Sequence, residues 1–361
     1  MKKILVTGGA GFIGSNFVRY WSNQYPEDFL LVLDKLTYAG NLASLPVIED
    51  KSKYQFVHGD INDQALVEGL LRDNKIDTIV HFAAESHVDR SITGPDEFLI
   101  TNIIGTHSLL KAARQIWITE KSVSNHRFHH VSTDEVYGSL ESADPAFTES
   151  TQYAPNSPYA ASKAASDHFV RAYLHTYGLQ VTTSNCSNNY GPYHFPEKLI
   201  PLVITNILNN QHLPVYGNGQ QIRDWLYVDD HARGIDVVLR EGVVGETYNI
   251  GGNNEWSNID VVNLICAEVD KQLQMNKSYK EMYPLAPIYS GKESKDLIRY
   301  VTDRPGHDVR YAIDSTKIVN DLSFTPSVSF QKGVTNTVSW YLSNPVWWRA
   351  LLSEPEVKET A

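Results

Sequence analysis

The sequence has little cysteine, no long apolar run and no excess of positive charge, and each shortage excludes a class of protein. Of its 361 residues only Cys186 and Cys266 are cysteines, and no CxxC pair or His/Cys spacing suits a zinc ion. We therefore expect free thiols in a reducing, cytoplasmic compartment. No stretch approaches the roughly 18 apolar residues of a membrane helix, and the apolar run after Met1 is too short for a secretory signal. Neither a membrane segment nor an export signal is expected.

The charge balance argues against nucleic acid as a partner. The formal net charge is −11, and no run of Lys and Arg interleaved with aromatic residues offsets it. A small anionic ligand stays compatible with this balance, because a few convergent Arg and Lys side chains can dominate the potential of a cleft.

Short apolar runs alternate with helical periodicity through the first half of the chain, which is typical of βαβ units around a parallel sheet. The predicted strands are 4–7, 29–34, 54–58, 78–82, 128–132 and 180–185. The predicted helices are 12–21, 64–73, 101–117 and 159–177. We expect an α/β protein with a Rossmann-like, doubly wound parallel sheet and helices on both faces.

A change of rhythm after Asn185 indicates a second, smaller α/β substrate lobe. The stretch SNNYGPYHFPEKLIP is rich in Pro, Gly and Asn and predicts a loop region over a cleft. We place the nucleotide-binding domain at residues 1–185, with the chain returning to it around 225–255. The smaller domain is placed at residues 186–224 and 256–361.

The stretch TGGAGFIGS, residues 7–15, follows the first predicted strand and opens the first predicted helix, which is the context of a glycine-rich phosphate motif. Gly9, Gly11 and Gly14 match GxGxxG, and Gly8, Gly11 and Gly14 give the wider GxxGxxG. Without Cβ atoms the turn bends tightly, and the helix N-terminus offers N–H groups to a pyrophosphate. The alternative is a glycine turn that packs a helix on the sheet and binds nothing.

Two acidic residues at strand ends extend this motif. Asp34 ends the second predicted strand twenty residues after Gly14. A carboxylate there accepts hydrogen bonds from the adenosine ribose and repels a 2′-phosphate, which favours NAD over NADP. Asp60 follows the third strand and is expected near the adenine, unless it only caps the strand end.

Tyr159 and Lys163 stand four residues apart in YAASK and project from one face of a predicted helix. A phenol with a pKa near 10 needs about 4 kcal/mol of preferential stabilisation to act as a base near neutrality. We expect the Lys163 ammonium and a positive nicotinamide ring to supply it. An ordinary surface Tyr and Lys pair is the alternative, but Thr133 at the end of an upstream strand favours the catalytic interpretation.

Two carboxyl groups, Asp134 and Glu135, directly follow Thr133 in HHVSTDEVYG. Hydride transfer alone needs one hydroxyl at such a place, and adjacent carboxylates are costly to bury without a task. The pair therefore indicates chemistry beyond hydride transfer. The alternative is that both merely cap a strand end in a plain dehydrogenase or epimerase.

Further blocks share this pattern with a known family. TGGAGFIGS and SPYAASKA specify only the superfamily of extended short-chain dehydrogenase/reductases. DKLTYAGN, AAESHVDRS, QIRDWLYVDDHA and ETYNIGG also look like family blocks, so the similarity runs over nearly the whole chain. STDEVYG, HFPEKLIP and DRPGHD are narrower and resemble the dTDP-glucose 4,6-dehydratases. The resemblance implies an NAD-dependent lyase that converts dTDP-glucose to dTDP-4-keto-6-deoxyglucose and water, for the biosynthesis of deoxysugars such as rhamnose.

The resemblance also implies three steps. Tyr159, with Thr133 hydrogen-bonded nearby, takes the proton of the hexose 4-hydroxyl while the C4 hydride passes to NAD, and the resulting ketone acidifies C5–H. Glu135 is then the base at C5, and Asp134 is the acid that protonates the departing C6 hydroxyl. The hydride returns to C6, so that NAD behaves as a bound prosthetic group. Asp134 must therefore be protonated while Glu135 is ionised.

Other site residues are carried over by motif, and for each of them loop packing or a surface ion pair is the ordinary alternative. The implied cofactor contacts are Gly8, Gly11, Phe12, Ile13, Gly14, Asp34, Lys35, Thr37, Asp60, Ile61, Ala83, Tyr159 and Lys163. Near the hexose the resemblance implies Ser86 and Arg90, and in the nucleotide and diphosphate pocket it implies Asn188, Lys198, Leu199, Pro214, Tyr216 and Asn258. The groups expected to neutralise the diphosphate are Arg223 and Arg304, with His307 three residues on.

Three further features are interpreted more simply. His129 and His130 are neighbours in a predicted strand and point to opposite faces, so that with His126 they are not expected to bind a metal. Trp347 and Trp348 are expected to pack against the smaller lobe. Residues 276–297 look longer and more polar than the family pattern, and their role is open between the nucleotide end of the pocket and a subunit contact.

The superfamily resemblance also implies a homodimer, because helices equivalent to 101–117 and 159–177 form its four-helix interface. Two other functions remain in competition. A nucleotide-sugar 4-epimerase shares every cofactor motif but has no need for both Asp134 and Glu135, and it loses no water. A catalytically silent NAD-binding regulatory protein would keep the fold alone, which intact Thr133, Tyr159 and Lys163 argue against.

Overall fold

A parallel sheet of seven strands forms the first unit of the molecule, within the residues 1–48, 50–303 and 306–353 that the computed structural model describes. Its strand order is β10-β6-β5-β4-β1-β2-β3, and every pair is parallel. The strands are β1 Lys3–Thr7, β2 Phe29–Asp34, β3 Tyr54–His58, β4 Thr78–His81, β5 Arg127–Thr133, β6 Val181–Cys186 and β10 Thr247–Ile250. The order reverses between β1 and β4, which opens a crevice at the carboxyl ends of these strands. The predicted Rossmann-like fold is confirmed.

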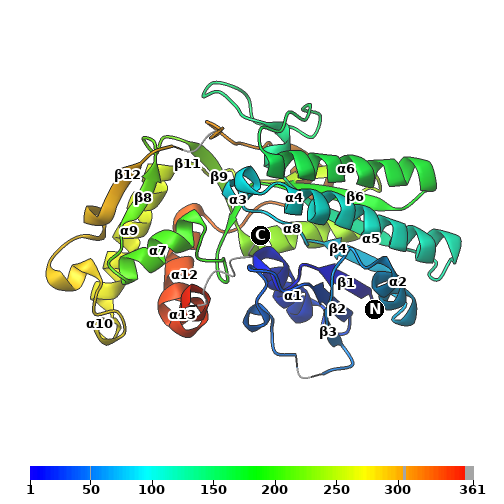
Figure 1. Cartoon of the computed structure of the whole chain (residues 1–361), viewed down its shortest axis with the longest axis horizontal. Helices are drawn as coiled ribbons and strands as arrows, with labels where there is room; N and C mark the ends of the chain where they lie inside the picture. Colours follow the sequence, from blue (N-terminus) through cyan, green and yellow to red (C-terminus); the bar gives the residue numbers. More distant parts are fainter. Residues whose placement is uncertain (49, 304–305, 354–361) are drawn as a thin grey trace. The chain divides into compact units, whose positions relative to one another are not determined.

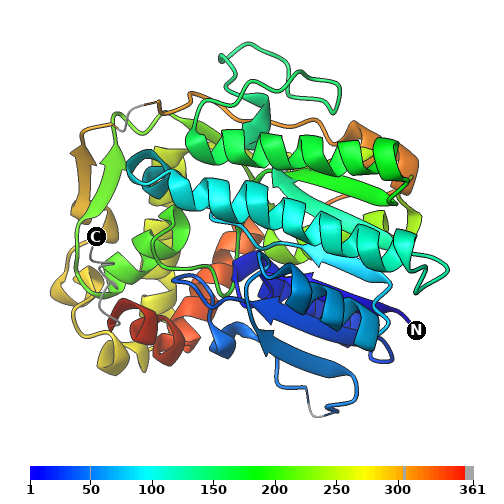
Figure 2. The ribbon, with the colours of Figure 1, turned by 45° about the vertical axis from the view of Figure 1, so that its right-hand side comes forward.

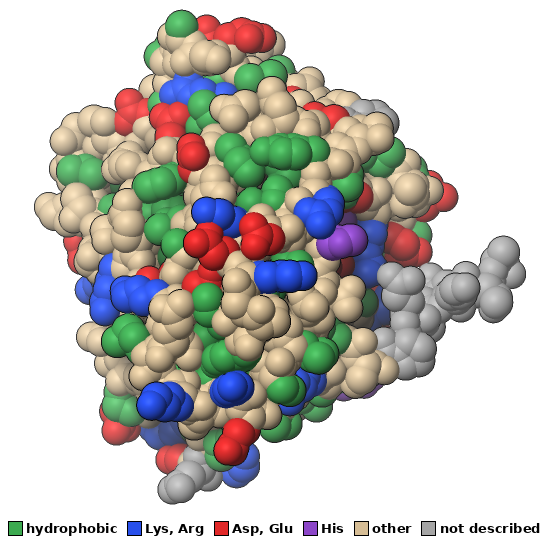
Figure 3. Space-filling view, turned by 90° about the vertical axis from the view of Figure 1, so that its left-hand side faces the viewer, with side chains coloured by type: hydrophobic (Ala, Val, Ile, Leu, Met, Phe, Trp, Pro, Cys, Tyr) green, Lys and Arg blue, Asp and Glu red, His purple; other side chains and the backbone are tan. Residues whose placement is uncertain are grey.

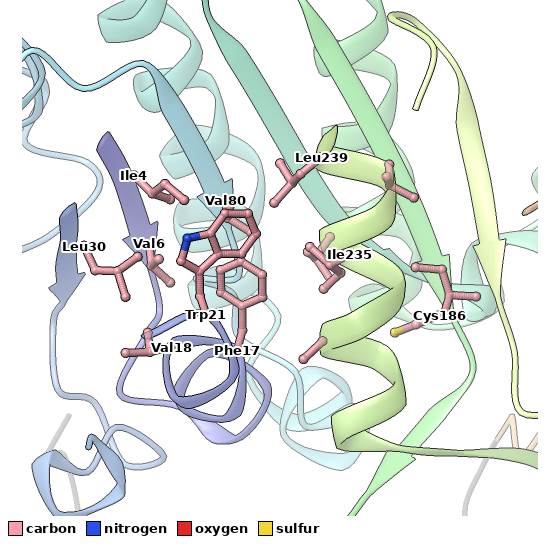
Figure 4. Packing of buried hydrophobic residues seen from close by; sticks show 14 of the residues in the cluster. Ile4, Val6, Phe17, Val18, Trp21, Leu30, Val80, Cys186, Ile235 and Leu239 are labelled. Atoms are coloured by element: carbon pink, nitrogen blue, oxygen red, sulfur yellow. The ribbon is translucent and has the colours of Figure 1, made fainter. Parts of the chain in front are cut away.

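Helices cover both faces of this sheet (Figure 1). One face carries α2 Gln64–Asp73, α5 Thr106–Ala113 and α6 Pro158–Tyr177, whose apolar side chains share a core cluster with the sheet. The other face carries α1 Phe12–Gln24 and α8 Val228–Glu241. Phe17 and Trp21 of α1 point toward Ile235 of α8 beside Val80, and all four side chains are fully buried (Figure 4).

The six predicted strands and four predicted helices all exist, with ends that differ by a few residues. The predicted helix 101–117 is part of a longer helical segment made of α4 Asp96–Phe98, the π-helical turns η2 Leu99–Gly105 and η3 Arg114–Thr119, and α5 between them. Figure 2 shows this segment side by side with α6. The seventh strand, β10, was not predicted as a strand, although the chain was expected to return to the sheet around it.

Local signals fix where α6 begins and ends. Ser157 caps its start by accepting a hydrogen bond from the Ala160 N–H at 3.0 Å, and Pro158 occupies the first turn. Gly178 ends the helix with φ of +74°, a left-handed conformation that favours glycine. The first turn of α6 is thereby fixed as the one that carries Tyr159.

The described chain divides into two compact units. Among the described residues, the first unit falls within 1–189, 223–255 and 306–327, and the second falls within 190–222, 256–303 and 328–353. The segment 306–327 thus belongs to the first unit, whereas the sequence assigned it to the smaller domain. The reason is packing: Arg310 bridges to Leu140, Ile313 bridges to Phe147, and the segment shares a hydrophobic cluster with Tyr137. Which ligand each unit serves stays a prediction.

The second unit combines helices with a short parallel sheet. Its helices are α7 Leu199–Leu208, α9 Asn258–Met275, α10 Tyr279–Met282, α12 Phe330–Ser343 and α13 Pro345–Ser353. Its sheet pairs β8 Leu213–Tyr216 with β12 Ile298–Val301. On the face drawn in Figure 3, Lys and Arg side chains alternate with Asp and Glu and do not gather into one basic field.

The remaining elements are short. The first unit also holds α3 Val88–Thr93, α11 Thr316–Leu322 and the 3-10 turns η1 Leu42–Ser44 and η4 Asp134–Tyr137. The strands β7 Asn188–Tyr190, β9 Ile222–Tyr227 and β11 Glu255–Ser257 form a three-stranded sheet in the order β11-β9-β7. Within the described residues, no helix has both the length and the apolar character needed to cross a membrane.

Residues 276–297, whose role was left open by the sequence analysis, pack onto the second unit through α10 and the 3-10 turns η5 Pro287–Ser290 and η6 Ser294–Leu297. Tyr283 is 1% exposed and donates a hydrogen bond to the Leu342 carbonyl at 2.7 Å. Trp348 is also buried and donates to the Tyr341 carbonyl at 3.0 Å. The segment therefore has a structural role in this unit, and the predicted packing of Trp348 is observed.

Candidate active site

The residues singled out at strand ends lie where the parallel sheet opens, at the carboxyl ends of β1, β2, β3 and β5. Parallel strands present these ends on one edge of the sheet, and ligands of doubly wound folds bind there. The described first unit therefore brings together the glycine turn, Asp34, Asp60 and the Thr133–Glu135 stretch.

The glycine turn between β1 and α1 leaves space that side chains would fill. Gly8 has φ of +69°, and a Cβ there would lie 2.5 Å from the Ala83 nitrogen. A Cβ on Gly14 would lie 2.3 Å from the Gly8 carbonyl oxygen. Gly11 is the N-cap of α1, and this helix start has no side-chain cap hydrogen bond. This is a cradle in which a diphosphate fits.

Asp34 is fixed against the same turn. Its Oδ2 accepts a hydrogen bond from the Ala10 N–H at 2.9 Å, and its Oδ1 accepts one from the Leu36 N–H at 2.8 Å. The side chain is 8% exposed, and burial raises its pKa while the two backbone hydrogen bonds act in the opposite direction. A carboxylate held in this way keeps lone pairs for ribose hydroxyls.

The next strand end carries an ion pair. Lys35 lies 3.0 Å from Asp60, and Asp60 also accepts a hydrogen bond from the Asn62 N–H at 2.9 Å. Burial tends to raise the pKa of Asp60, but the contacts to Asn62 and Lys35 outweigh it and the pKa is lowered. Of the other predicted cofactor contacts here, Ile61 is buried and Thr37 is exposed. Asp60 thus has a structural partner as well as its predicted ligand role.

The end of β5 holds the two adjacent carboxyl groups. The Thr133 hydroxyl accepts a hydrogen bond from the Glu135 N–H at 3.3 Å and donates one to Asp134 Oδ1 at 3.3 Å. Asp134 is 2% exposed, and its Oδ2 has no hydrogen-bond partner within the described part of the chain. Glu135 is only partly buried. The two neighbours therefore occupy different surroundings.

These surroundings set the protonation of Asp134. Burial is the largest cause that raises its pKa well above the usual range, and the negative charges of Glu135 and Asp224 add to it. Arg223 and the Thr133 hydroxyl lower the pKa without cancelling the rise. These surroundings therefore favour the protonated form of Asp134, which is the form that a proton donor needs.

Tyr159 and Lys163 lie on the buried face of α6, 9% and 5% exposed. Lys163 Nζ donates a hydrogen bond to the Val131 carbonyl at 2.8 Å. Contrary to the expectation of a lowered value, the pKa of Tyr159 is raised well above 10, because the phenol is buried and faces the negative charge of Glu135. A hydrogen bond with Thr133 acts in the opposite direction.

Predicted substrate residues of the first unit lie on several elements. The Arg223 side chain is buried, donates to the Asp308 carbonyl at 3.0 Å, and has its guanidinium carbon 4.3 Å from the Tyr311 ring centre. Arg90 of α3 lies 3.8 Å over the Tyr38 ring. Of the other three, Ser86 is exposed, and Asn188 and His307 are partly buried. Arg304 lies outside the described residues.

Predicted substrate residues of the second unit lie near its short sheet and at the start of α7. Pro214 and Tyr216 are on β8, and Tyr216 is 41% exposed. The Asn258 N–H donates a hydrogen bond to the Gln221 carbonyl at 3.0 Å. Because Gln221 lies in the turn that follows Tyr216, Asn258 is linked to the same part of the second unit. Lys198 and Leu199 are at the start of α7. A single pocket formed by these and the first-unit residues stays a prediction.

The two neighbouring histidines face different protein groups. His129 makes hydrogen bonds with the hydroxyls of Thr182 and Ser184 at 3.0 and 3.1 Å. His130 Nε2 lies 3.0 Å from Asp167. Across residues 1–48, 50–303 and 306–353, no group of three or more His, Cys, Asp and Glu side chains is arranged to hold a metal ion.

Three charged or phenolic groups near the site were missed by the sequence interpretation. Asp167 follows Lys163 by four residues, so the spacing that identified Tyr159 and Lys163 could have identified it too. Asp224 is adjacent to Arg223, within the block QIRDW. Tyr311 had no local signal, because its contact with Arg223 depends on tertiary packing.

Comparison with known proteins gives a consistent result. The sequence model of a family described as "GDP-mannose 4,6 dehydratase" matches residues 5–337. A dTDP-glucose 4,6-dehydratase of Escherichia coli is 54% identical over 360 residues, covering 97% of this chain and 96% of the relative. One from Neisseria meningitidis serogroup B is also 54% identical, covering 98% of this chain and 97% of the relative.

Solved structures show the same relationship. A dTDP-glucose 4,6-dehydratase of Streptomyces venezuelae, solved with NAD bound, has a TM-score of 0.85 at 46% identity, and 97% of this chain and 99% of that chain are covered. A UDP-glucose 4-epimerase of Thermotoga maritima, solved with UDP-glucose, has a TM-score of 0.78 at 26% identity, with 94% and 99% covered. The fold is therefore shared with epimerases as well.

Proposed function

The chain belongs to the family of dTDP-glucose 4,6-dehydratases, and from this membership we propose that it converts dTDP-glucose to dTDP-4-keto-6-deoxyglucose and water with NAD as cofactor. The product is a precursor for deoxysugars such as rhamnose. The observation that carries the proposal is the pair Asp134 and Glu135 at the end of β5, in which burial and the neighbouring charge raise the pKa of Asp134. A reaction that removes water requires such an acid beside a base.

The glycine turn and Asp34 are the residues that would hold NAD. The diphosphate would bind at the uncapped start of α1, where a Cβ on Gly14 would fill the space, and Asp34 would accept hydrogen bonds from the ribose. When bound, NAD supplies the acceptor and later the donor of the hydride, together with a positive ring near Tyr159.

Tyr159 and Lys163 handle the first proton. Tyr159 accepts the proton of the hexose 4-hydroxyl, and the hydrogen bond with Thr133 favours the phenolate that does so. Lys163 contributes a positive charge from the next turn of α6, held by the Val131 carbonyl at 2.8 Å. The raised pKa of Tyr159 means that these positive charges must outweigh burial and Glu135 before the phenol acts as a base.

Glu135 and Asp134 then divide the elimination. Glu135 takes the proton from C5, and Asp134 donates a proton to the C6 hydroxyl as it leaves as water. The burial of Asp134 keeps the donor protonated, and the partial exposure of Glu135 is consistent with an ionised base. An epimerase needs neither of these proton transfers.

On the substrate side, Arg223 is proposed to bind the diphosphate, because its buried guanidinium presents a planar fork that suits phosphate oxygens. The same side chain lowers the pKa of Asp134, so it also tunes the acid. Tyr216, Asn258 and Lys198 of the second unit are proposed to bind the nucleotide end.

A homodimer and a cytoplasmic location are part of the proposal. Leu99, Ile100 and Ile104 of η2 and Phe169 of α6 are large apolar side chains that are 40–55% exposed. An exposed apolar group on adjacent helices is typical of a subunit interface. Both cysteines are free and buried, which is compatible with a reducing compartment.

The test uses dTDP-glucose deuterated at C4. We expect the product to have lost one water and to carry the deuterium at C6, because elimination and internal hydride return both occur. A product of unchanged mass inverted at C4 would instead identify a 4-epimerase, the alternative suggested by the shared fold. If the protein turned over no nucleotide sugar, the catalytically silent NAD-binding regulatory protein would be the interpretation that remains.

A further inference from the structure

A third ionisable side chain continues the row of Tyr159 and Lys163 along α6. Asp167 stands four residues after Lys163, so all three project from one face of the helix. All three are buried, and Asp167 is 7% exposed. A carboxylate is thus fixed one turn beyond the ammonium, on the side away from Tyr159.

Asp167 is held by two hydroxyl groups, one from the strand that supports the site and one from a neighbouring loop, and it lies close to a histidine of the same strand. Its Oδ2 accepts hydrogen bonds from the hydroxyls of Ser132 and Tyr153, both at 2.9 Å. Its Oδ1 lies 3.0 Å from His130 Nε2. Ser132 directly precedes Thr133, so the carboxylate is anchored to the strand that positions the reacting groups.

The Asp167 carboxylate opposes the effect of burial on the Lys163 ammonium. Its ammonium donates to the Val131 carbonyl, which is a neutral acceptor and does not compensate the loss of solvent. Burial lowers the pKa of Lys163, and the negative charge of Asp167 acts in the opposite direction, with a smaller contribution from Cys186. An ammonium without such a partner would lose its proton more readily.

We propose that Asp167 is a positioning residue that keeps the Lys163 ammonium protonated and fixed against the Val131 carbonyl, and that it acts on Tyr159 only through Lys163. The proposal rests on the proposed function, in which Lys163 supports the Tyr159 phenolate. It assigns a role to a buried carboxylate that takes no part in the proton transfers of Asp134 and Glu135.

Of the described ionisable groups around Lys163, Asp167 is the one that carries a negative charge at neutral pH. Burial raises its pKa to about 6, and Lys163, Ser132, Tyr153 and His168 limit the rise, so it is ionised above that value. His130 faces it, but burial lowers the pKa of His130 well below the usual range and this imidazole is neutral. The same holds for His81, whose ring lies 5.3 Å from that of His130. Tyr137 also faces the carboxylate, and burial raises the pKa of its phenol, so it too is neutral.

The experiment compares the pH dependence of kcat for dTDP-glucose dehydration in Asp167→Asn and in the wild type. Asn keeps the size and one acceptor oxygen but removes the charge. We expect the alkaline limb to move to lower pH by about one unit, so that kcat near pH 9 falls about tenfold more than kcat near pH 7. Asp167→Glu, which keeps the charge, should restore most of the alkaline limb.

Matched controls separate charge from packing. Ser132→Ala and Tyr153→Phe each remove one hydrogen bond to the same carboxylate and leave its charge, so the alkaline limb should stay in place. In a Lys163→Arg background the Asp167→Asn shift should vanish, because a guanidinium does not lose its proton in this range. Should Asp167→Asn fail to fold, Asp167→Ser serves as the neutral variant, since it leaves room for a water between the two hydroxyls.

The outcomes are distinct. An active wild type with an unshifted alkaline limb in Asp167→Asn overturns this inference alone, and so does an equal shift in Ser132→Ala or Tyr153→Phe. A wild type that releases no 4-keto product overturns the proposed function and this inference with it. A shift confined to the charge-removing variants supports both.

Discussion

The buried carboxyl group of Asp134 accepts a hydrogen bond from the Thr133 hydroxyl, and the negative charge of its other neighbour, Glu135, helps to raise the Asp134 pKa well above its usual range. Burial and this charge therefore favour the protonated form of Asp134, beside a neighbouring carboxyl group that is only partly buried. A shared proton between two equivalent groups would give neither a dependable acid nor a dependable base.

Glu135→Gln should stop the reaction after C4 oxidation. The base at C5 is lost while Tyr159, Thr133 and Lys163 are unchanged, so kcat should fall by roughly 10²–10⁴-fold and reduced coenzyme should accumulate on the protein. Its absorbance in a single turnover checks this. Glu141→Gln, an exposed carboxylate shortly after the same strand, is the control and should behave as the wild type. Equal rates for both variants would contradict the role of Glu135.

Asp134→Asn should stabilise the fold most at neutral and alkaline pH. The folded pKa of Asp134 lies above its unfolded value of about 3.9, so the unfolded state binds fewer protons between the two values and stability is lost as the pH rises through this window. The Asn side chain removes that loss. Tm should therefore rise by a few degrees near pH 8 and change little near pH 4. A Tm gain that is the same at both pH values would mean that Asp134 is not buried as an acid.

Gly14→Ala should abolish NAD binding, because the new Cβ would meet the Gly8 carbonyl oxygen at 2.3 Å and displace the turn that holds the diphosphate. The amount of NAD that co-purifies with the protein measures this. Gly69→Ala on α2 is the matched control, since a Cβ there meets nothing within 4 Å. That variant should bind NAD normally and be more stable by about 0.5–1 kcal/mol. NAD retained at the wild-type level in Gly14→Ala would count against the cradle.

Tyr283→Phe should destabilise the second unit without changing kcat. It removes the donor to the Leu342 carbonyl from a side chain that is 1% exposed, which costs roughly 1–3 kcal/mol when the acceptor is left unpaired. Thermal unfolding monitored by tryptophan fluorescence gives the shift. Tyr279→Phe, whose hydroxyl is in an exposed contact with Ser343, should leave Tm unchanged. A fall in kcat at unchanged stability would give residues 276–297 a part in the site.

Phe169→Glu should dissociate the proposed homodimer. The side chain is 40% exposed on α6, and a carboxylate at a buried apolar interface is strongly unfavourable. Sedimentation equilibrium should show a monomer for this variant and a dimer for Val47→Glu, where a 94% exposed side chain is changed elsewhere on the first unit. A wild type that sediments as a monomer would end the dimer proposal.

The sequence predicted those parts of the fold that depend on local patterns. Strands such as Phe29–Asp34 and helices such as Gln64–Asp73 carry their periodicity within a few residues, and the structure has both with the same ends. β10 has only four residues and pairs with β6, which ends about sixty residues earlier, so no local pattern identifies it. The return of residues 306–327 to the first unit is equally non-local.

The site divides in the same way. Motifs identified Thr133, Asp134 and Glu135 because their residue types and order are unusual, whereas the direction of the Tyr159 pKa followed from burial that spacing does not reveal. The partner of Arg223, Tyr311, comes from a segment nearly ninety residues later in the sequence. Residue types and spacing thus predict candidates, and tertiary packing decides their partners and protonation.

The three-part construction of the first unit also bears on how the protein is made. A nascent chain that has emerged only as far as residue 189 has all of β1 to β6 but neither β10 nor α8, so β6 is an open sheet edge and one face of the sheet is covered by α1 without α8. The unit is complete only after residue 327. Early domains commonly fold during synthesis. Between the synthesis of β6 and that of β10, this chain instead exposes an unpaired sheet edge that favours aggregation, so chaperones that shield nascent chains should raise its yield.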